Sequence, residues 1–288
     1  MNSPPAPTAL QQPLQEALAL HREGKHELAM QRYVAILQQN PGNVDALYYV
    51  AMIAIQQQQF ADGLKVIARA LELSPSEARL HNLKGQVHLR QNADDDALNS
   101  FSRAIEVDPA FADAYGNRGT LLSEMGRAAE ALTDFDRALA LRPNNPEDHC
   151  NCASALADLG HLDAALQGFT RAIALMPEMA PAYFNRAGVL MRLGQPAEAL
   201  RDCDWAIGLC PEMPAAHSQR GIALKALGRL DEALASAERA LALQPDLAEA
   251  HASRGHVLKA MDRAAEAEAS FKRAAELNAK FENLAGKA

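Results

Sequence analysis

The sequence predicts an all-α fold, a solenoid of eight stacked helical hairpins, on three observations. The first is composition: 49% of the 288 residues are apolar but only 5% are aromatic, and alanine and leucine, both good helix formers, dominate. The second is a proline that recurs every 34 residues, and the third is a set of small residues with the same spacing. A repeat of this length is typical of stacked helix pairs.

Seven prolines set the length of the repeat, because proline cannot continue a helix and marks the end of each hairpin. They are Pro41, Pro75, Pro109, Pro143, Pro177, Pro211 and Pro245. With proline at position 32, the eight repeats are expected at residues 10–43, 44–77, 78–111, 112–145, 146–179, 180–213, 214–247 and 248–281. Each should hold two antiparallel helices of roughly 13 to 14 residues. A disordered, proline-rich lead at residues 1–9 and a short tail at residues 282–288 flank the repeats.

Two columns of small residues should let the helices of one hairpin approach closely. Position 8, counted from the start of each repeat, holds Ala17, Ala51, Gly85, Gly119, Ala153, Ala187, Gly221 and Gly255. Position 20 holds Ala29, Gly63, Ala97, Ala131, Ala165, Ala199, Ala233 and Ala267. Between the helices we expect tight turns, since a positive φ costs glycine little. The turn glycines are Gly24, Gly126, Gly160, Gly194 and Gly228.

This pattern resembles the tetratricopeptide repeat (TPR), and the resemblance covers residues 10–281. It implies that neighbouring hairpins stack on a continuous core and wind a right-handed superhelix, whose first helices line a concave groove. In the eighth repeat, Glu268 and Ala275 replace the larger apolar residues of the other repeats. A polar or small surface is what a solenoid end needs to stay in solution, so we expect the array to stop near Phe281.

Position 6 of four consecutive repeats carries a carboxamide, which predicts a ladder along the groove. The four residues are Asn117, Asn151, Asn185 and Gln219. Each amide offers donors and an acceptor that match the N–H and C=O of an extended peptide. The segments Tyr115-Gly-Asn-Arg-Gly119 and Tyr183-Phe-Asn-Arg-Ala187 are similar to the asparagine-bearing repeats of O-GlcNAc transferases. That resemblance implies asparagines that grip a polypeptide; the alternative is that asparagine is simply common at this position.

The two ends of the predicted groove differ in chemistry. Tyr48 and Met52 give its N-terminal end an apolar lining, whereas Arg192, Lys225 and Lys259 make its C-terminal end basic. A partner with a hydrophobic segment at one end and acidic residues at the other would complement this groove. Alternatively, the first hairpin or the lead covers the apolar part. Positions 5 and 9 hold no lysine, which argues against the carboxylate clamp of the family members that bind chaperone tails.

Arginine at position 7 is interpreted as structural. Two of these arginines lie sixteen residues before an aspartate, in the pairs Arg118–Asp134 and Arg186–Asp202. This spacing predicts an ion pair between the two helices of each hairpin. Arg220 and Arg254 have serine at the same spacing and need other partners.

No constellation in the sequence predicts catalysis, a metal or a cofactor. The segment His149-Cys-Asn-Cys152 holds three potential zinc ligands, but no second Cys/His pair follows at a finger-like spacing. The sequence contains no phosphate-binding glycine loop and no nucleophile elbow. Histidine recurs at position 4, where we expect it to fill a slot that usually holds an aromatic side chain. These residues are His81, His149, His217 and His251.

The net charge of −8 and the isoelectric point of about 5.6 disfavour nucleic acid and anionic membranes as partners. No stretch of about 18 apolar residues is present to span a bilayer. The start of the chain lacks the basic and apolar regions of a signal peptide. Four cysteines in a chain of this size do not make a disulfide framework, so a cytoplasmic protein with reduced thiols is expected.

The sequence therefore predicts a non-enzymatic scaffold or adaptor that binds an extended peptide in its groove. The alternative is the substrate-recognition arm of an O-GlcNAc-transferase-like glycosyltransferase, or of another enzyme complex. Assembly with further copies of the chain through the ends of the solenoid is a third hypothesis.

Overall fold

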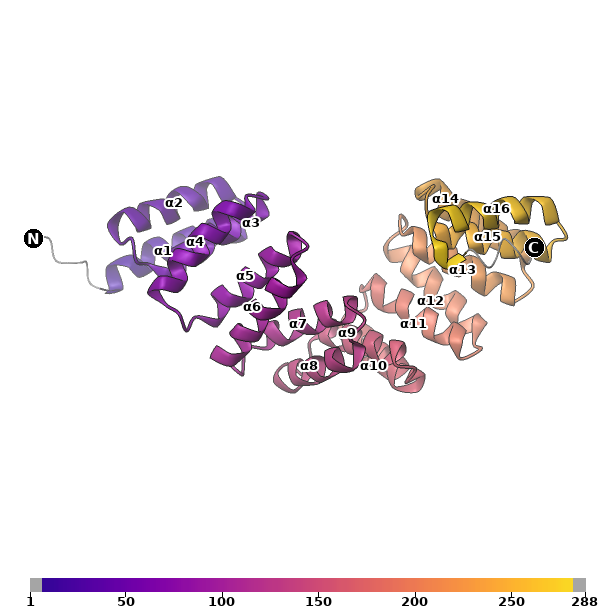
Figure 1. Ribbon diagram of the computed structural model, residues 1–288, viewed down its shortest axis with the longest axis horizontal. Helices are drawn as coiled ribbons and strands as arrows, with labels where there is room; N and C mark the ends of the chain where they lie inside the picture. The colour runs from indigo at the N-terminus through magenta and orange to yellow at the C-terminus, as the bar shows by residue number, and fades with distance from the viewer. Residues whose placement is uncertain (1–6, 282–288) are drawn as a thin grey trace, which may run out of the picture. The chain divides into compact units, whose positions relative to one another are not determined.

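The computed structural model describes residues 7–281, and within that range it is all-helical, with sixteen α-helices in eight consecutive hairpins (Figure 1). The first helices of the hairpins are α1 (Pro7–Arg22), α3 (Val44–Gln56), α5 (Ala78–Arg90), α7 (Ala112–Glu124), α9 (Pro146–Asp158), α11 (Ala180–Arg192), α13 (Pro214–Ala226) and α15 (Ala248–Ala260). The second helices are α2 (His26–Gln39), α4 (Phe60–Leu73), α6 (Asp94–Val107), α8 (Ala128–Leu141), α10 (Leu162–Leu175), α12 (Pro196–Leu209), α14 (Leu230–Leu243) and α16 (Ala264–Leu277). The predicted all-α solenoid is confirmed. Each helix in the described range is too short or too polar to cross a membrane.

Seven of the eight first helices begin at the first residue of a predicted repeat, from Val44 to Ala248. The exception is α1, which begins at Pro7, so residues 7–9 of the predicted disordered lead are helical. Proline suits the first helical position because its missing N–H would have no partner there and its φ is already helical. The rest of the predicted lead, residues 1–6, and the predicted tail at 282–288 lie outside the described part of the chain.

The turn between the two helices of each hairpin contains one residue with a positive φ, at position 15. The five predicted glycines adopt this conformation, and Gln58, Asn92 and Asp262 adopt it in the other three repeats. The residue that follows donates its N–H back to the end of the first helix, for example from Gln59 to the carbonyl of Ala54 at 2.8 Å. The turn geometry is therefore common to all eight repeats, although glycine is not.

In repeats 3, 4 and 8, glycine at position 8 makes room for the aromatic ring at position 24 of the same hairpin. A Cβ atom added to Gly85 would lie 2.5 Å from the ring of Phe101, and one added to Gly119 would lie 2.8 Å from the ring of Phe135. Carbon atoms in contact are normally about 3.5 to 4.0 Å apart, so a methyl group does not fit at either position. Glycine thus brings the two helices together over a fully buried ring.

In repeats 3, 5, 7 and 8, the histidine at position 4 joins the repeat to the one before it. The Nε2 atoms of these histidines lie 2.8 to 2.9 Å from the carbonyl oxygen of the proline six residues earlier, which ends the preceding hairpin. The pairs are His81–Pro75, His149–Pro143, His217–Pro211 and His251–Pro245. Because a carbonyl can only accept, Nε2 is the donor in each pair. Histidine therefore ties the junction between repeats, beyond the expected filling of an aromatic slot.

The chain divides into two compact units, repeats 1–4 up to Leu141 (unit 1) and repeats 5–8 from Arg142 (unit 2). Each unit has its own buried side chains. Tyr33 and Phe101 are fully buried in unit 1, and Leu224 and Leu258 in unit 2. In unit 2, the first helices α9, α11, α13 and α15 each contact the next one, so their exposed faces adjoin.

Candidate functional site

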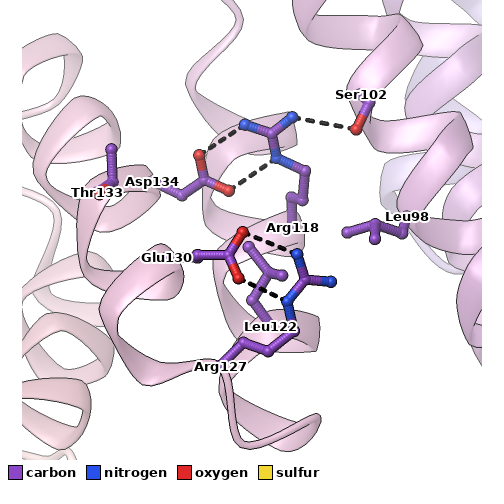
Figure 2. Close-up of a pocket in the computed structure, with 8 residues that line it drawn as sticks. All are labelled: Leu98, Ser102, Arg118, Leu122, Arg127, Glu130, Thr133 and Asp134. Atoms are coloured by element: carbon purple, nitrogen blue, oxygen red, sulfur yellow. Dashed lines mark hydrogen bonds and ion pairs between the residues drawn. The ribbon is translucent and has the colours of Figure 1, made fainter. Parts of the chain in front are cut away.

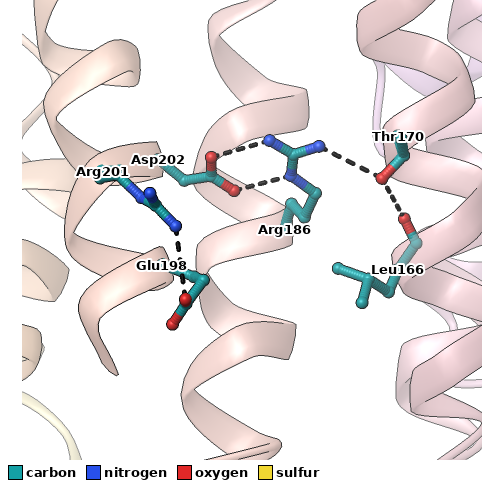
Figure 3. A network of polar contacts seen from close by, with 6 residues as sticks. All are labelled: Leu166, Thr170, Arg186, Glu198, Arg201 and Asp202. Atoms are coloured by element: carbon teal, nitrogen blue, oxygen red, sulfur yellow. Dashed lines mark hydrogen bonds and ion pairs between the residues drawn. The ribbon is translucent and has the colours of Figure 1, made fainter. Parts of the chain in front are cut away.

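The arginines at position 7 form the ion pairs that the sequence predicts. The Nε and Nη2 atoms of Arg118 each donate to one carboxylate oxygen of Asp134 at 2.7 Å (Figure 2). Arg186 binds both oxygens of Asp202 in the same way, at 2.7 and 2.8 Å (Figure 3). The hydrogen bonds that the two arginines donate to these carboxylates raise the pKa values of both guanidinium groups. Each pair joins the two helices of one hairpin, from α7 to α8 or from α11 to α12.

The same arginines also reach the second helix of the preceding repeat, which the sequence analysis did not foresee. Arg118 donates through Nη1 to the hydroxyl of Ser102 at 3.0 Å, and Arg186 donates to that of Thr170 at 3.2 Å (Figures 2 and 3). Both hydroxyls stand at position 25 of their repeat. One arginine therefore ties its own hairpin and its neighbour together.

Repeats 7 and 8 use this geometry with the two partners exchanged. Arg220 donates at 2.6 Å to Asp204, which lies at position 25 of the preceding repeat, and at 2.6 Å to Ser236 of its own hairpin. Arg254 likewise lies 3.3 Å from Ser270 of its own hairpin and 4.0 Å from Glu238 of the preceding repeat. Position 25 was the available signal in the sequence. In the two repeats that combine arginine at position 7 with serine at position 23, the preceding repeat has an acidic residue at position 25, Asp204 or Glu238.

A cavity of about 300 Å³ in unit 1 lies beside the first of these pairs, between α6, α7 and α8 (Figure 2). Its charged groups are already matched. Asp134 forms an ion pair with Arg118, and Glu130 accepts two hydrogen bonds from Arg127, both at 2.7 Å. We interpret this cavity as a by-product of the ion pairs, since it offers a ligand no uncompensated charge.

The asparagines of the predicted ladder use part of their amide to join neighbouring repeats. The Nδ2 of Asn117 donates to Oδ1 of the buried Asn82 at 2.9 Å, and the Nδ2 of Asn185 lies 3.4 Å from the hydroxyl of Ser154. Asn151 is half-buried on α9. Asn117 belongs to unit 1 and the other members of the ladder to unit 2. These contacts between repeats belong to neither interpretation of the amides drawn from the sequence, the peptide ladder or a residue that is simply common at this position.

Three of the predicted site residues meet in one cavity of about 260 Å³ in unit 2, which polar and apolar residues line together. Asn185, Arg192 and Gln219 line it together with Ser154 and Asp158. Arg192 is anchored there by a 2.7 Å hydrogen bond to the carbonyl of Ala157, near the end of α9. The side-chain amide of Gln219 has no hydrogen bond to any described residue, although the residue is half-buried.

A second, mostly apolar cavity of about 410 Å³ adjoins the first, because Phe184 and Gln219 line both. Its other apolar lining comes from Met191, Ala215, Ile222 and Leu247, and its polar lining from Ser218 and Glu249. Ile222 is 43% exposed, which is unusual for a large apolar side chain on a first helix. We call the two cavities together the unit-2 groove. Its apolar half was not predicted, although Ile222 could have been found as an isoleucine at groove position 9.

Lys225 lies near the end of α13, and His256 and Lys259 lie on α15; none of the three lines either cavity. The imidazole of His256 packs edge-on against Phe271, with ring centroids 4.9 Å apart. Partial burial lowers the pKa of His256, and the two nearby lysine ammonium groups lower it further. Lys225 forms no ion pair with a described residue.

The predicted apolar lining in unit 1 is partly covered. Tyr48 and Met52 are half-buried against a cluster that includes Ile67 and Leu83. The guanidinium of Arg79 lies 5.1 Å from the centre of the Tyr48 ring, and Arg79 is itself held by Glu77 and Asp45. This arginine of the third repeat is a covering beyond the two expected from the sequence, the first hairpin and the lead.

The described residues hold no group of three or more His, Cys, Asp or Glu side chains that could bind a metal ion. Three cysteines, Cys150, Cys152 and Cys203, are buried. Burial raises the pKa of Cys150 to about 11 and that of Cys203 to about 12, so both thiols stay protonated near neutral pH.

Models of the tetratricopeptide repeat match residues 20–87, 112–145, 153–214 and 248–281, and a further TPR model matches residues 221–262. These matches follow the hairpins described above. The chain is a tetratricopeptide-repeat protein. No curated protein sequence matches this TPR chain.

Solved TPR structures share the fold at low sequence identity. A chain of the APC/C hetero-tetramer Cut9–Hcn1 superposes with a TM-score of 0.73 at 16% identity, over 91% of the TPR chain and 52% of that chain. PilW, a type IV pilus biogenesis factor, gives 0.66 at 23% identity, with coverages of 72% and 96%. YrrB, described as a TPR protein with an unusual peptide-binding site, gives 0.53 at 24% identity, with coverages of 64% and 95%. The TPR chain thus spans about half the length of the Cut9–Hcn1 chain.

None of these matched models and structures is an O-GlcNAc transferase. The similarity of the asparagine-bearing TPR segments to those enzymes therefore stays a prediction. The TPR fold itself is typical of scaffolds that bind other proteins.

Proposed function

We propose that this TPR chain is a non-catalytic binding protein, which holds an extended segment of a partner protein in the unit-2 groove. One observation carries the proposal. The unpaired amide of Gln219 stands where a cavity of mixed lining and a mostly apolar cavity adjoin, on the adjoining faces of first helices.

An extended peptide matches this arrangement in two ways. Its backbone presents N–H and C=O groups that the amide of Gln219 can bind, since a carboxamide both donates and accepts. The Oδ1 of Asn185 is a second acceptor nearby, because only the Nδ2 of this residue is used between the repeats. The side chains of an extended peptide alternate in direction, so one can enter the apolar cavity beside Phe184 and Ile222.

The unit-2 groove is a better candidate than the region of Tyr48 and Met52 in unit 1, where the Arg79 guanidinium already occupies the exposed ring face. The alternative role, as the recognition arm of a glycosyltransferase, has no observation in its favour among the described residues. Assembly through the ends of the solenoid likewise stays a prediction.

The proposal is tested by panning a displayed library of linear peptides against the immobilised full chain. We expect enriched peptides that lose at least about tenfold in affinity on Gln219→Ala, because a buried peptide group would lose its hydrogen-bond partner. Ile222→Glu should abolish binding by placing a carboxylate in the apolar cavity.

Leu209→Glu is the matched control, since Leu209 is similarly exposed (37%) but lies on α12, a second helix outside the groove. Circular dichroism would verify that each variant keeps its helix content. Failure to enrich any peptide, or peptides that bind Ile222→Glu as tightly as the parent, would overturn the proposal.

A further inference from the structure

Basic side chains cluster one helical turn beyond the apolar half of the unit-2 groove. Lys225 follows Ile222 by three residues on α13, and Lys225 and Lys259 both act on the imidazole of His256. Arg192, Lys225 and Lys259 come from three consecutive repeats, at positions 12 and 13, and His256 lies at position 9 of the last of them. The chain as a whole has 36 acidic and 28 basic residues, so this cluster runs against its net charge of −8. A local excess of one charge on an otherwise opposite surface attracts a partner of complementary charge.

Near the starts of α13 and α15, the apolar cavity is lined by two apolar residues and one acidic residue, with no basic side chain. Ala215 and Glu249, both at position 2 of their repeats, and Leu247, which ends repeat 7, line it there. A segment that lies in the groove therefore meets an apolar cavity in the middle and positive charge towards the ends of α13 and α15. Because successive side chains of an extended segment point to opposite sides, one residue can enter the cavity while its neighbours reach the basic cluster.

We infer that the segment held in the unit-2 groove is acidic: an apolar side chain enters the cavity lined by Phe184, Ile222 and Leu247, and a neighbouring Asp or Glu carboxylate binds Lys225 and His256. The inference rests on the proposed function and names the chemical class of the partner segment.

His256 gives this interaction a dependence on pH. The charged groups that act on its imidazole are Lys225 of α13 and Lys259 of its own helix, while α16 contributes the uncharged ring of Phe271. Burial and the two lysines keep the imidazole neutral in the free protein, whereas a bound carboxylate favours the imidazolium form. Binding then takes up a proton, so the affinity increases as the pH falls from 8 towards 6.

The test uses a short peptide, acetylated and amidated at its ends, that alternates leucine with glutamate, and matched peptides with glutamine or lysine in place of glutamate. Binding to the full chain is measured by fluorescence anisotropy at several salt concentrations and at pH 6 and 8. The glutamate peptide should bind most tightly, more tightly at pH 6, and the lysine peptide least. Lys225→Gln should weaken only the glutamate peptide, by about fivefold.

Two control variants separate a specific site from general attraction. Lys272→Gln removes a charge from α16, outside the groove, and should leave all three peptides unchanged. His256→Gln should remove the dependence on pH while preserving the order of the peptides. An equal loss on Lys272→Gln and Lys225→Gln would overturn the inference, because the attraction would then depend on overall charge only.

The failure of this inference differs from the failure of the proposed function. If the glutamate and glutamine peptides bind equally and Ile222→Glu abolishes both, the groove binds peptides and the acidic specificity is wrong. If none of the three peptides binds and library panning enriches nothing, both proposals are overturned. If panning enriches peptides without acidic residues, the inference alone is overturned.

Discussion

Repeats 6 and 7 are neighbours in unit 2 and carry arginine at the same position, yet they neutralise it in different ways. Arg186 of repeat 6 is paired with Asp202 of its own hairpin, whose side chain is only 7% exposed. Arg220 of repeat 7 is paired with Asp204 of the preceding repeat, whose side chain is 52% exposed. The first pair is largely buried and joins the two helices of one hairpin, whereas the second is exposed and joins two neighbouring hairpins. Equivalent positions in a repeat protein can therefore differ in which interface they stabilise.

The largest expected effect comes from removing the arginine of the buried pair. Arg186→Met should lower the free energy of unfolding by about 3–5 kcal/mol, because it leaves the Asp202 carboxylate buried without a partner. Urea denaturation measures this, followed by the fluorescence of Trp205, the one tryptophan of the chain, which stacks on Tyr183 of the same repeat.

The double variant Arg186→Met/Asp202→Leu is the control, since it removes both charges and should recover most of the loss. Arg220→Met should cost below about 1 kcal/mol, because Asp204 is left hydrated. Similar losses for Arg186→Met and Arg220→Met would contradict the distinction between the two repeats.

Repeat 5 sharpens the comparison because it has no ion pair at this place. Gly168 stands where repeat 6 has its aspartate, and a Cβ atom added there would lie 2.8 Å from the Cβ of Ala153. Gly168→Ala should therefore destabilise unit 2 by about 1–2 kcal/mol, because both Cβ atoms are fixed to a helix backbone and the two helices would have to move apart. Thermal unfolding followed by circular dichroism measures the change.

Gly208→Ala is the matched control for that substitution. It also lies within a helix but has no atom within 4 Å of the added Cβ, so alanine should stabilise by up to about 1 kcal/mol through helix propensity. If Gly168→Ala stabilises as Gly208→Ala does, repeat 5 does not depend on close approach of its helices.

The smallest expected effect is that of the exposed acid. Asp204→Ala should cost about 0.5 kcal/mol at low salt and almost nothing at 1 M salt, because a hydrated ion pair is screened. Denaturation of the parent and the variant at both salt concentrations measures the difference. A loss that persists at 1 M salt would mean that Asp204 acts through packing rather than charge.

Sequence reasoning was effective where the determining chemistry is local. Proline ends a helix and glycine permits a turn wherever they occur, so the starts of seven first helices agree with the prediction. The spacing of Arg118 and Asp134 also lies within one hairpin, and the pair is confirmed.

Contacts between repeats were harder to predict because they depend on which residues of two hairpins face each other. The role of Asp204 beside Arg220 required that knowledge, and so did the bond from Asn117 to Asn82. The apolar cavity was missed for a related reason. Ile222 stands at a groove position in the sequence, but only the position of Phe184 on the neighbouring helix makes it part of a cavity.

Each of the arginines at position 7 has one carboxylate and one hydroxyl partner, one in its own repeat and one in the preceding repeat. This arrangement determines which whole repeats can be removed without leaving an arginine unpaired. Deletion of all 34 residues of repeat 6 would bring Thr170 opposite Arg220, which would then have two hydroxyl neighbours and no carboxylate. Deletion of repeat 7 would instead bring Asp204 opposite Arg254 and conserve the charge balance. The array should therefore tolerate deletion of repeat 7 better than deletion of repeat 6.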